Sequence, residues 1–431
     1  MKIAILAAGA GGMYCGSCMR DNDLAMTLKR LGHDVTLVPL YTPLRTEAQT
    51  PSSSEVFYGG VNVYLQHAAR LFRHTPRVFD WIFDRPWLLG IAGNMGAQTP
   101  PEKLADFTLD ILRGEDGSAQ KELNRLIRFI KEHVRPQVVS LPNLMFIGLA
   151  RTFRESLGVP VVCELTGEDI FLDAMHPADR DRLRTVIRQR VADVTRFVAT
   201  SGYYADRMAE YLGLPRQQID VVFTGVPQEY LDPPLPRADA SLGRSPTVGY
   251  LARICPEKGF DQVLEAMAEL IELPGMSEAK LKIAGYLGSR DEKWAKGLLR
   301  GLVKTKLADA VTFLGEVDRA QKLQMLDSID VFTVPTAYPE AKGVYVLEAL
   351  ARGVPVVQPE HGAFPEMIQR TGGGLLSPPG DATALARKLA ELLGDPIRRR
   401  QMGQLGRAAV QADFTDERMA EGMLKVFQSA I

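Results

Sequence analysis

Residues 335–357, which read PTAYPEAKGVYVLEALARGVPVV, combine two carboxylates with an expected helix start. A loop carrying Glu340 separates an expected strand from a helix that begins near Val344, and Glu348 lies about one turn into this helix. The first N–H groups of a helix have no partner within it and stand at the positive end of its dipole, so they suit a phosphate or a sugar oxygen. Gly343 lets the main chain approach such a ligand closely. The pattern indicates a site where both carboxylates reach one ligand, Glu340 from the loop before the helix and Glu348 from its second turn.

Residues 249–260, GYLARICPEKGF, place two cations five positions apart in a loop between an expected strand and helix. A diphosphate that leaves a substrate gains negative charge as its bond breaks, so fixed cations stabilise the transition state more than the ground state. Arg253 can hold two phosphate oxygens with its planar fork, whereas Lys258 supplies a point charge. A solvated charged loop is the alternative interpretation, and the neighbouring acidic motif weakens it.

A glycine-rich loop, Gly9-Ala-Gly11-Gly12, follows the first expected strand. A dinucleotide-binding fingerprint requires a small residue at position 14, which here is Tyr14. The second expected strand ends in Val38-Pro39-Leu40, without an acid for a ribose hydroxyl. A nicotinamide cofactor is therefore disfavoured, and Gly12 is the residue expected to approach a ligand.

Short apolar runs alternate with amphipathic segments along the chain, and this alternation restarts once. Strands are expected first at residues 2–8, 34–40, 138–141, 159–165 and 197–200, and then at 247–251, 280–284, 311–314, 331–335 and 354–357. Continuous apolar strands separated by helices predict mostly parallel sheets covered on both faces. The predicted fold class is α/β, with two doubly wound Rossmann-like domains and ligands beyond the carboxyl ends of the strands.

Proline-rich stretches around residues 226–236 mark the expected boundary between the domains. The predicted organisation is an N-terminal domain at 1–227 with an insertion at about 70–118, a linker at 228–245, a C-terminal domain at 246–412, and a final helix within 413–431. Met419, Met423 and Val426 give that helix an apolar face, so we expect it to pack back towards the N-terminal domain.

Composition excludes several classes of protein. The 431 residues include 51 Lys and Arg against 52 Asp and Glu, a balance that argues against nucleic-acid binding. No apolar stretch approaches the length of a membrane span, and residues 1–6 fit a buried strand better than a signal peptide. Four cysteines make no disulfide framework, so a reducing cytoplasm is expected. The arginines and tryptophans of the insertion fit a packed helical segment, with peripheral membrane contact as the alternative.

Together the two motifs resemble the retaining glycosyltransferases of family 4 (glycosyl transferases group 1). The resemblance lies in Glu340-x7-Glu348 followed by Ala-Leu-Ala-x-Gly-x-Pro-Val-Val, and in the matching Arg253 and Lys258. It covers the C-terminal domain densely and the N-terminal domain thinly. It implies the GT-B fold, in which an acceptor-side domain faces a nucleotide-sugar-binding domain across a cleft.

The resemblance also implies roles for individual residues. Arg253 and Lys258 would hold the donor diphosphate, and Glu340 would position the sugar, so these three are the expected catalytic residues. The expected substrate-binding residues are Gly12, Thr166, Glu316, Gly343, Val344, Tyr345 and Glu348, of which Glu348 would bind the donor ribose. Residues 283–285, 313–317 and 362–366 resemble the family's two base-contacting loops and its post-strand turn. The two cations replace a metal, no cofactor is implied, and the acceptor is an unspecified hydroxyl compound.

The sequence departs from the family pattern in the N-terminal domain. A histidine that contacts the transferred sugar in many members aligns with Thr166, and another aligns with Ser140 or Pro142. Glu168 and the neighbouring Glu164 and Asp169 could replace those contacts or form an ordinary polar strand end. The alternatives are a catalytically degenerate GT-B protein that binds a nucleotide or glycan without transfer, and a sugar-nucleotide epimerase, for which no motif is present.

Cysteines at positions 15, 18, 163 and 255 fall near expected strand ends or helix starts. Cys15 and Cys18 could have lowered pKa values, form a disulfide or hold half a metal site. The four cysteines together suggest a metal site, but no complete ligand spacing is present. Reduced thiols are the favoured interpretation, and no metal is expected.

Overall fold

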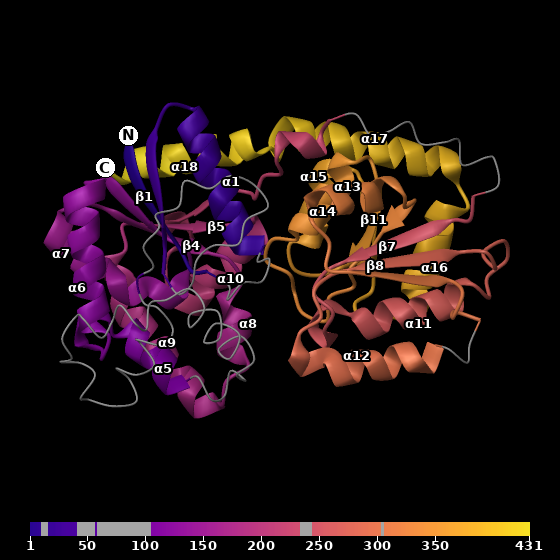
Figure 1. Ribbon diagram of the computed structural model, residues 1–431, viewed down its shortest axis with the longest axis horizontal. Coiled ribbons are helices and arrows are strands. Elements are labelled where there is room, and N and C mark those ends of the chain that lie inside the picture. The colour runs from indigo at the N-terminus through magenta and orange to yellow at the C-terminus, as the bar shows by residue number, and fades with distance from the viewer. Residues whose placement is uncertain (10–15, 41–56, 58–104, 233–243, 303–305) are drawn as a thin grey trace. The chain divides into compact units, whose positions relative to one another are not determined.

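The computed structural model describes residues 1–9, 16–40, 57, 105–232, 244–302 and 306–431. The chain forms two compact units (Figure 1). Unit 1 contains Met1–Phe223 and Met419–Ile431, and unit 2 contains Thr224–Arg418. Among the described residues, no helix is both long and apolar enough to cross a membrane.

Unit 1 is built on a six-stranded sheet with the order β2-β1-β3-β4-β5-β6, in which every neighbouring pair is parallel. The strands are β1 (Lys2–Ala7), β2 (Asp34–Pro39), β3 (Val138–Leu141), β4 (Val161–Leu165), β5 (Arg196–Ala199) and β6 (Ile219–Val221). Every residue of β3 and β4 is buried, as expected for strands that are covered on both faces.

Helices flank this sheet. Within the described residues these helices are α1 (Gly16–Arg30), α5 (Ala105–Leu112), α6 (Gln120–Phe129), α7 (Ala150–Leu157), α8 (Glu168–Asp173), α9 (Pro177–Arg190) and α10 (Gly202–Leu212). Local sequence sets their ends: Ser201 caps α10 by accepting from the Tyr204 N–H, and Gly213 ends it at φ 73°. The described part of the predicted insertion contains α5, which packs against α9.

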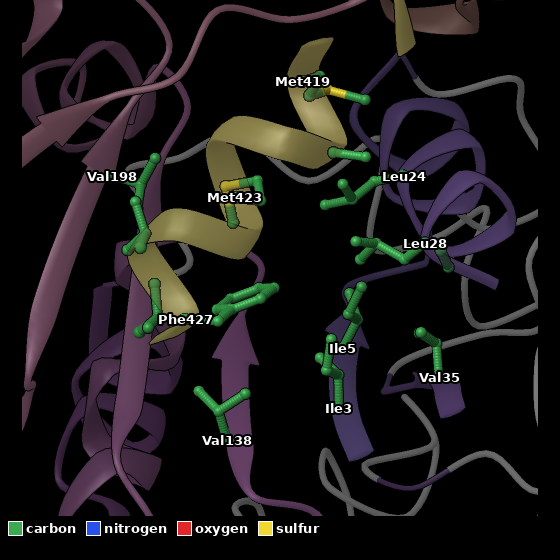
Figure 2. Close-up of a cluster of buried hydrophobic side chains, with 14 of the residues drawn as sticks. Ile3, Ile5, Leu24, Leu28, Val35, Val138, Val198, Met419, Met423 and Phe427 are labelled. Atoms are coloured by element: carbon green, nitrogen blue, oxygen red, sulfur yellow. The ribbon is translucent and has the colours of Figure 1, made fainter. Parts of the chain in front are cut away.

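The last helix, α18 (Asp416–Ala430), completes the core of unit 1 (Figure 2). Its buried residues Met419, Met423 and Phe427 join one hydrophobic cluster with side chains from the N-terminal sheet and α1. Those partners include Ile3, Ile5, Leu24, Leu28, Val35, Val138 and Val198. The chain therefore returns to unit 1 after building all of unit 2.

Unit 2 repeats the architecture with a second parallel six-stranded sheet, ordered β12-β11-β10-β7-β8-β9. Its strands are β7 (Thr247–Leu251), β8 (Lys280–Ala284), β9 (Val311–Gly315), β10 (Val331–Phe332), β11 (Val356–Pro359) and β12 (Gly374–Ser377). Its helices are α11 (Phe260–Leu270), α12 (Ser289–Leu302), α13 (Arg319–Asp327), α14 (Val344–Ala351), α15 (Phe364–Thr371), α16 (Ala382–Leu393) and α17 (Pro396–Asp413). The predicted fold class, with two Rossmann-like α/β domains, is confirmed.

Residues 224–232, here termed the connector segment, belong to unit 2, although the sequence assigned them to the first domain and the linker. The Val226 N–H donates to the Phe414 carbonyl (2.9 Å), and Val226 forms a parallel bridge with Thr415. Gly225 is required here, because a Cβ would lie 2.2 Å from the Thr415 carbonyl oxygen. Tyr230 is buried. These contacts fasten the described start of the proline-rich stretch to unit 2.

Candidate functional site

A buried ion pair joins the two C-terminal motifs. Lys258 ends the short helical turn Pro256–Lys258 after β7, and Glu340 lies in the loop after β10. Because β7 and β10 are parallel neighbours, their carboxyl ends meet at one edge of the sheet. The Lys258 Nζ lies 2.5 Å from Glu340 Oε2 across 82 positions of sequence. Glu340 is only 5% exposed, so the charge of its carboxylate depends on this partner.

Two tyrosines complete the surroundings of this pair. The hydroxyls of Tyr345 (3.0 Å) and Tyr338 (3.4 Å) donate to the same Glu340 oxygen that binds Lys258. The Lys258 ammonium lies 5.0 Å from the centre of the Tyr338 ring and 5.3 Å from that of Tyr345. The other Glu340 oxygen accepts from the Ala341 N–H (3.2 Å). The carboxylate is thus fixed at both oxygens.

The pKa values of these groups follow from burial and from the pair itself. Burial alone raises the pKa of Glu340, but the Lys258 ammonium, together with the Lys342 charge and the Tyr345 hydroxyl, lowers the pKa to about 2. Burial alone lowers the pKa of Lys258, and the Glu340 carboxylate, with the Tyr338 hydroxyl, raises it above its ordinary value of 10.5. Burial and the Glu340 charge raise the pKa of Tyr338 to about 12 and that of Tyr345 well above its ordinary value. At neutral pH the pair is ionised and both phenols are neutral.

We expect the coupling between Lys258 and Glu340 to weaken in acid. The pKa of Glu340 is lower in the folded protein than its ordinary value of 4.5, so the stability from the pair is fully present above about pH 4.5 and is lost as the pH falls towards 2. Urea unfolding of the wild type, Lys258→Met, Glu340→Gln and the double variant gives this coupling free energy as a double-mutant cycle. The coupling should be smaller at pH 3 than at pH 7, and equal values would contradict the assignment.

Two glycines allow the loops that carry the pair to pack backbone against backbone. Gly259, at φ 66°, has no room for a side chain, because a Cβ would lie 1.7 Å from the Pro335 carbonyl oxygen. A Cβ at Gly362 would lie 2.4 Å from the Glu340 nitrogen, and the next residue, Ala363, donates its N–H to the Glu340 carbonyl (2.8 Å). The turn at 362–366 therefore supports the loop of Glu340.

Arg253 lies in the same loop as Lys258, with its side chain 54% exposed. Its Nε donates to Cys255 Sγ (3.3 Å), and its Nη2 lies 4.0 Å from a Glu257 oxygen. The single proton of the buried Tyr250 hydroxyl is shared between the carbonyl oxygens of Arg253 (3.2 Å) and Lys258 (3.3 Å). The Tyr250 hydroxyl thereby holds the backbone of the 253–258 loop, while the Arg253 guanidinium remains accessible to an anion.

The start of α14 has the conformation expected of a ligand-binding turn. Gly343 adopts φ 54° directly before Val344, the first residue of the helix. A Cβ at Gly343 would lie 3.0 Å from a ring carbon of Phe364, which makes this position tight for any other residue. Val344 and Tyr345 are half-buried. The Tyr345 hydroxyl reaches back to Glu340, which links the helix start to the ion pair.

Glu348 and Glu316 lie in other elements of unit 2, Glu348 within α14 and Glu316 directly after β9. One Glu348 oxygen, Oε1, accepts from Lys322 Nζ (2.9 Å) and from the Tyr230 hydroxyl (2.9 Å), so the carboxylate has partners separate from those of Glu340. Glu316 is exposed in the turn between β9 and α13, on a different loop from the Lys258–Glu340 pair.

In unit 1, Thr166 lies at the end of β4 and binds the start of α8. Its N–H (2.9 Å) and hydroxyl (2.8 Å) donate to a Glu168 oxygen. Glu168 also accepts from the Gly167 N–H (3.2 Å) and the Tyr204 hydroxyl (3.2 Å). The Tyr204 hydroxyl lies 2.9 Å from Asp169 as well. Two of the three carboxylates that could replace the family's histidine contacts, Glu168 and Asp169, are thus engaged by groups of the protein itself.

Glu164 is engaged in the same way. It forms an ion pair with the buried Arg20 of α1, and its other oxygen accepts from the Ser140 hydroxyl (3.2 Å). Arg20 also lies 3.3 Å from Asp21. The predicted Gly12 lies outside the described residues, so no contact is assigned to it.

The described cysteines do not form a metal site. Cys18, Cys163 and Cys255 are buried reduced thiols, and burial raises the pKa of Cys163 well above its ordinary value. Within the ranges that the structure describes, no cluster of three or more His, Cys, Asp or Glu side chains could hold a metal ion. Cys15 lies outside those ranges.

Sequence reasoning missed Tyr230, Tyr250, Lys322 and the hydroxyl of Tyr345. The two motifs did contain Tyr250 and Tyr345, but neither motif indicates where a phenol points. Tyr230 and Lys322 lie outside both motifs and reach Glu348 only through the fold.

Comparisons with known proteins identify the family of the chain. Residues 236–409 match the family of glycosyl transferases group 1, and residues 20–225 match the glycosyl transferase 4-like domain. D-inositol 3-phosphate glycosyltransferase of Nocardia farcinica is 31% identical over 399 residues, which cover 86% of this chain and 85% of that protein. A GDP-mannose-dependent α-(1-6)-phosphatidylinositol monomannoside mannosyltransferase of Mycobacterium tuberculosis is 32% identical over 55% of this chain and 62% of that protein.

Solved structures show the same fold at lower identity. Sucrose-phosphate synthase of Thermosynechococcus elongatus superposes with a TM-score of 0.72 at 20% identity, covering 99% of this chain and 98% of that one. HepE of Anabaena, in complex with UDP and glucose, superposes with a TM-score of 0.69 at 17% identity over the full length of both chains. The chain belongs to the glycosyltransferases with a glycosyl transferases group 1 domain, on the GT-B fold.

Proposed function

We propose that this glycosyltransferase takes its sugar from a nucleoside-diphosphate sugar and transfers it to a hydroxyl acceptor with retention of configuration. The observation that carries the proposal is the convergence of Lys258, Glu340 and the start of α14 at one edge of the sheet of unit 2. A cation pair and a helix start suit a diphosphate, and the adjacent carboxylate suits sugar hydroxyls.

In the proposed mechanism, Arg253 and Lys258 bind the diphosphate and stabilise the charge that develops on it as the glycosidic bond breaks. Glu340 accepts hydrogen bonds from the sugar, and the N–H groups of Gly343, Val344 and Tyr345 bind sugar and phosphate oxygens. The acceptor hydroxyl attacks from the face that the diphosphate leaves, and its proton passes to the leaving phosphate. The two cations perform the task that a divalent metal performs in other transferases, so the proposed reaction needs no metal.

The relatives guide the choice of substrates to test. The mycobacterial relative is GDP-mannose-dependent, and the Anabaena neighbour was solved with UDP and glucose, so GDP-mannose and UDP-glucose are the first donors. The Nocardia relative is a D-inositol 3-phosphate glycosyltransferase, which makes a polyol phosphate the first acceptor. The four cysteines of this chain do not make a disulfide framework, which supports a reducing cytoplasm as the site of the reaction.

Transfer assays with purified protein test the proposal. We expect GDP-mannose or UDP-glucose to raise the melting temperature and to be consumed in the presence of an acceptor, with NMR showing the donor's anomeric configuration in the product. Arg253→Ala should lose transfer by about a hundredfold or more without a lower melting temperature, because this side chain is half exposed. Turnover of Arg253→Ala at the wild-type rate would contradict the assigned role.

A catalytically degenerate protein is the second candidate. Thr166 occupies the position of the family's histidine, and Glu168 and Asp169 are engaged by protein groups. This candidate requires binding of the nucleotide sugar with neither transfer nor hydrolysis, whereas product formation would eliminate it.

A further inference from the structure

The carboxylate of Glu348 is held by two side chains from distant parts of the sequence. The Tyr230 hydroxyl, 118 positions away, and the Lys322 Nζ each lie 2.9 Å from Glu348 Oε1. Tyr230 is 1% exposed and Lys322 is 7% exposed, so both contacts are shielded from water. The Lys322 ammonium also lies 5.8 Å from the centre of the Tyr230 ring. The three side chains form one compact group, here termed the Glu348 clamp.

The backbone on the Tyr230 side of the clamp is held rigidly. Arg352, just after α14, donates from Nη1 to the carbonyls of Tyr230 (3.2 Å) and Asp232 (2.9 Å). Asp327, at the end of α13, accepts from Arg352 Nε (2.8 Å) and Nη2 (2.7 Å). Arg407 of α17 donates to the Leu231 carbonyl (2.5 Å). A bidentate pair such as Arg352–Asp327 fixes orientation as well as distance.

The Lys322 side of the clamp is anchored through α13. A capping box closes the start of this helix: Asp318 accepts from the Gln321 N–H (2.8 Å), and the Gln321 side chain accepts from the Asp318 N–H (3.0 Å). Lys322 follows directly and so projects from a well-defined first turn. The ammonium therefore reaches Glu348 from a fixed helix.

The two donors of the Glu348 clamp bind only one oxygen of the Glu348 carboxylate. Both donors bind Oε1, and among the described residues Oε2 has no hydrogen-bond partner. Oε2 is not among the fully buried polar atoms that lack a partner, so it keeps some exposed surface. The fixed orientation of Oε1 thus determines where Oε2 points.

We propose that Tyr230 and Lys322 are positioning residues that set the recognition of the donor ribose by Glu348. This inference rests on the proposed function, and it takes Glu348 as the residue that accepts a hydrogen bond from a hydroxyl of the donor ribose. Without either donor the carboxylate gains rotational freedom, so the bond from the hydroxyl to Oε2 is no longer preorganised. Tyr230 and Lys322 affect only the binding of the ribose. Their effect can therefore be distinguished from damage to the site, which would weaken the binding of ribose and dideoxy forms alike.

Discrimination between ribose and dideoxyribose measures this role. Isothermal titration with GDP and UDP, and with their 2′,3′-dideoxy forms, gives two dissociation constants for each base. The measured ratio is the dissociation constant of the dideoxy form divided by that of the ribose form. A hydrogen bond to a charged group predicts a wild-type ratio of about 10 or more, and Glu348→Gln should reduce it towards 1. Tyr230→Phe and Lys322→Met should each reduce the ratio at least about threefold, mainly by weakening the ribose form. Lys322→Arg should restore part of it.

Matched controls separate positioning from structural damage. Tyr211→Phe removes a buried phenol oxygen in unit 1 that has no partner among the described residues, and Lys296→Met removes an exposed ammonium of α12. Both should leave the ratio unchanged. Equal loss of affinity for ribose and dideoxy forms in Tyr230→Phe would indicate a merely structural role and overturn the inference.

The outcomes distinguish this inference from the proposed function. If the wild type binds neither nucleotide, the proposed nucleotide site fails. If it binds the ribose and dideoxy forms equally, the nucleotide site stands, but the ribose role of Glu348 and the positioning role of Tyr230 and Lys322 are both overturned. A third outcome concerns the positioning role alone. If the wild type prefers the ribose form and Glu348→Gln loses that preference, Glu348 reads the ribose. If Tyr230→Phe and Lys322→Met nevertheless keep the wild-type ratio, the positioning role is overturned.

Discussion

A Lys258→Met variant is expected to lose about a hundred- to a thousandfold in kcat/KM and to be markedly less stable than the wild type. The loss of activity follows from removing the ammonium that stabilises charge on the leaving diphosphate. The loss of stability has a separate cause, because the Glu340 carboxylate is left buried without its ion-pair partner at 2.5 Å. Breaking one side of such a pair costs about 3–5 kcal/mol. Steady-state kinetics with the donor found by screening, and urea unfolding, measure the two effects.

The double variant separates these two causes. Lys258→Met with Glu340→Gln leaves no uncompensated charge, so stability should recover while activity stays low. The Tyr338 and Tyr345 hydroxyls can still donate to the amide oxygen that replaces the carboxylate at position 340. Lys296→Met, which changes an exposed lysine paired with Glu292, is the matched control and should alter neither quantity. Activity of Lys258→Met within about threefold of the wild type would remove the proposed mechanism.

Phe427→Ala should destabilise unit 1 by about 3–5 kcal/mol. Its side chain is fully buried and belongs to the hydrophobic cluster that α18 shares with β1, β3 and α1. Figure 2 shows the ring among Val138, Val198 and Met423. Truncation leaves a cavity between the helix and the sheet. Since two units need not unfold together, hydrogen exchange of individual peptides is the suitable measurement.

The neighbouring residue supplies the control for this prediction. Gln428 follows Phe427 directly and is exposed, so Gln428→Ala should leave exchange unchanged. In Phe427→Ala, amides of β1 and β3 should exchange faster, whereas those of β7 and β10 in unit 2 should keep their protection. Uniform acceleration in both units would show that α18 stabilises the whole chain rather than unit 1.

The fold could be predicted where strands are apolar along their whole length. β1, β3, β4 and β7 are largely apolar and buried, and all were anticipated within a few residues. The strands β6 and β12, of three and four residues, were not predicted, because such short runs differ little from loops. β10 was expected to extend to Pro335 but ends at Phe332, and the following residues form the approach to Glu340.

The candidate site could be predicted only as far as its motifs extend. Lys258 and Glu340 were assigned to one ligand, and their side chains form an ion pair. The arrangement around them depends on side-chain directions that no spacing encodes, such as the Tyr338 and Tyr345 phenols. Thr166 was expected to face the sugar, and in the structure its hydroxyl donates to Glu168 two residues later. The sequence alone does not tell whether such a hydroxyl binds a neighbouring side chain or a ligand.

The return of α18 to unit 1 has a consequence for biosynthesis. The N-terminal sheet emerges from the ribosome first, but its hydrophobic cluster lacks Met419, Met423 and Phe427 until unit 2 has been translated. Domains ordinarily fold in the order of their synthesis. Here unit 2 can fold on the nascent chain before α18 is made. Until then, the part of the unit 1 cluster that α18 covers stays exposed to water, so the first domain to be synthesised is the last to complete its core.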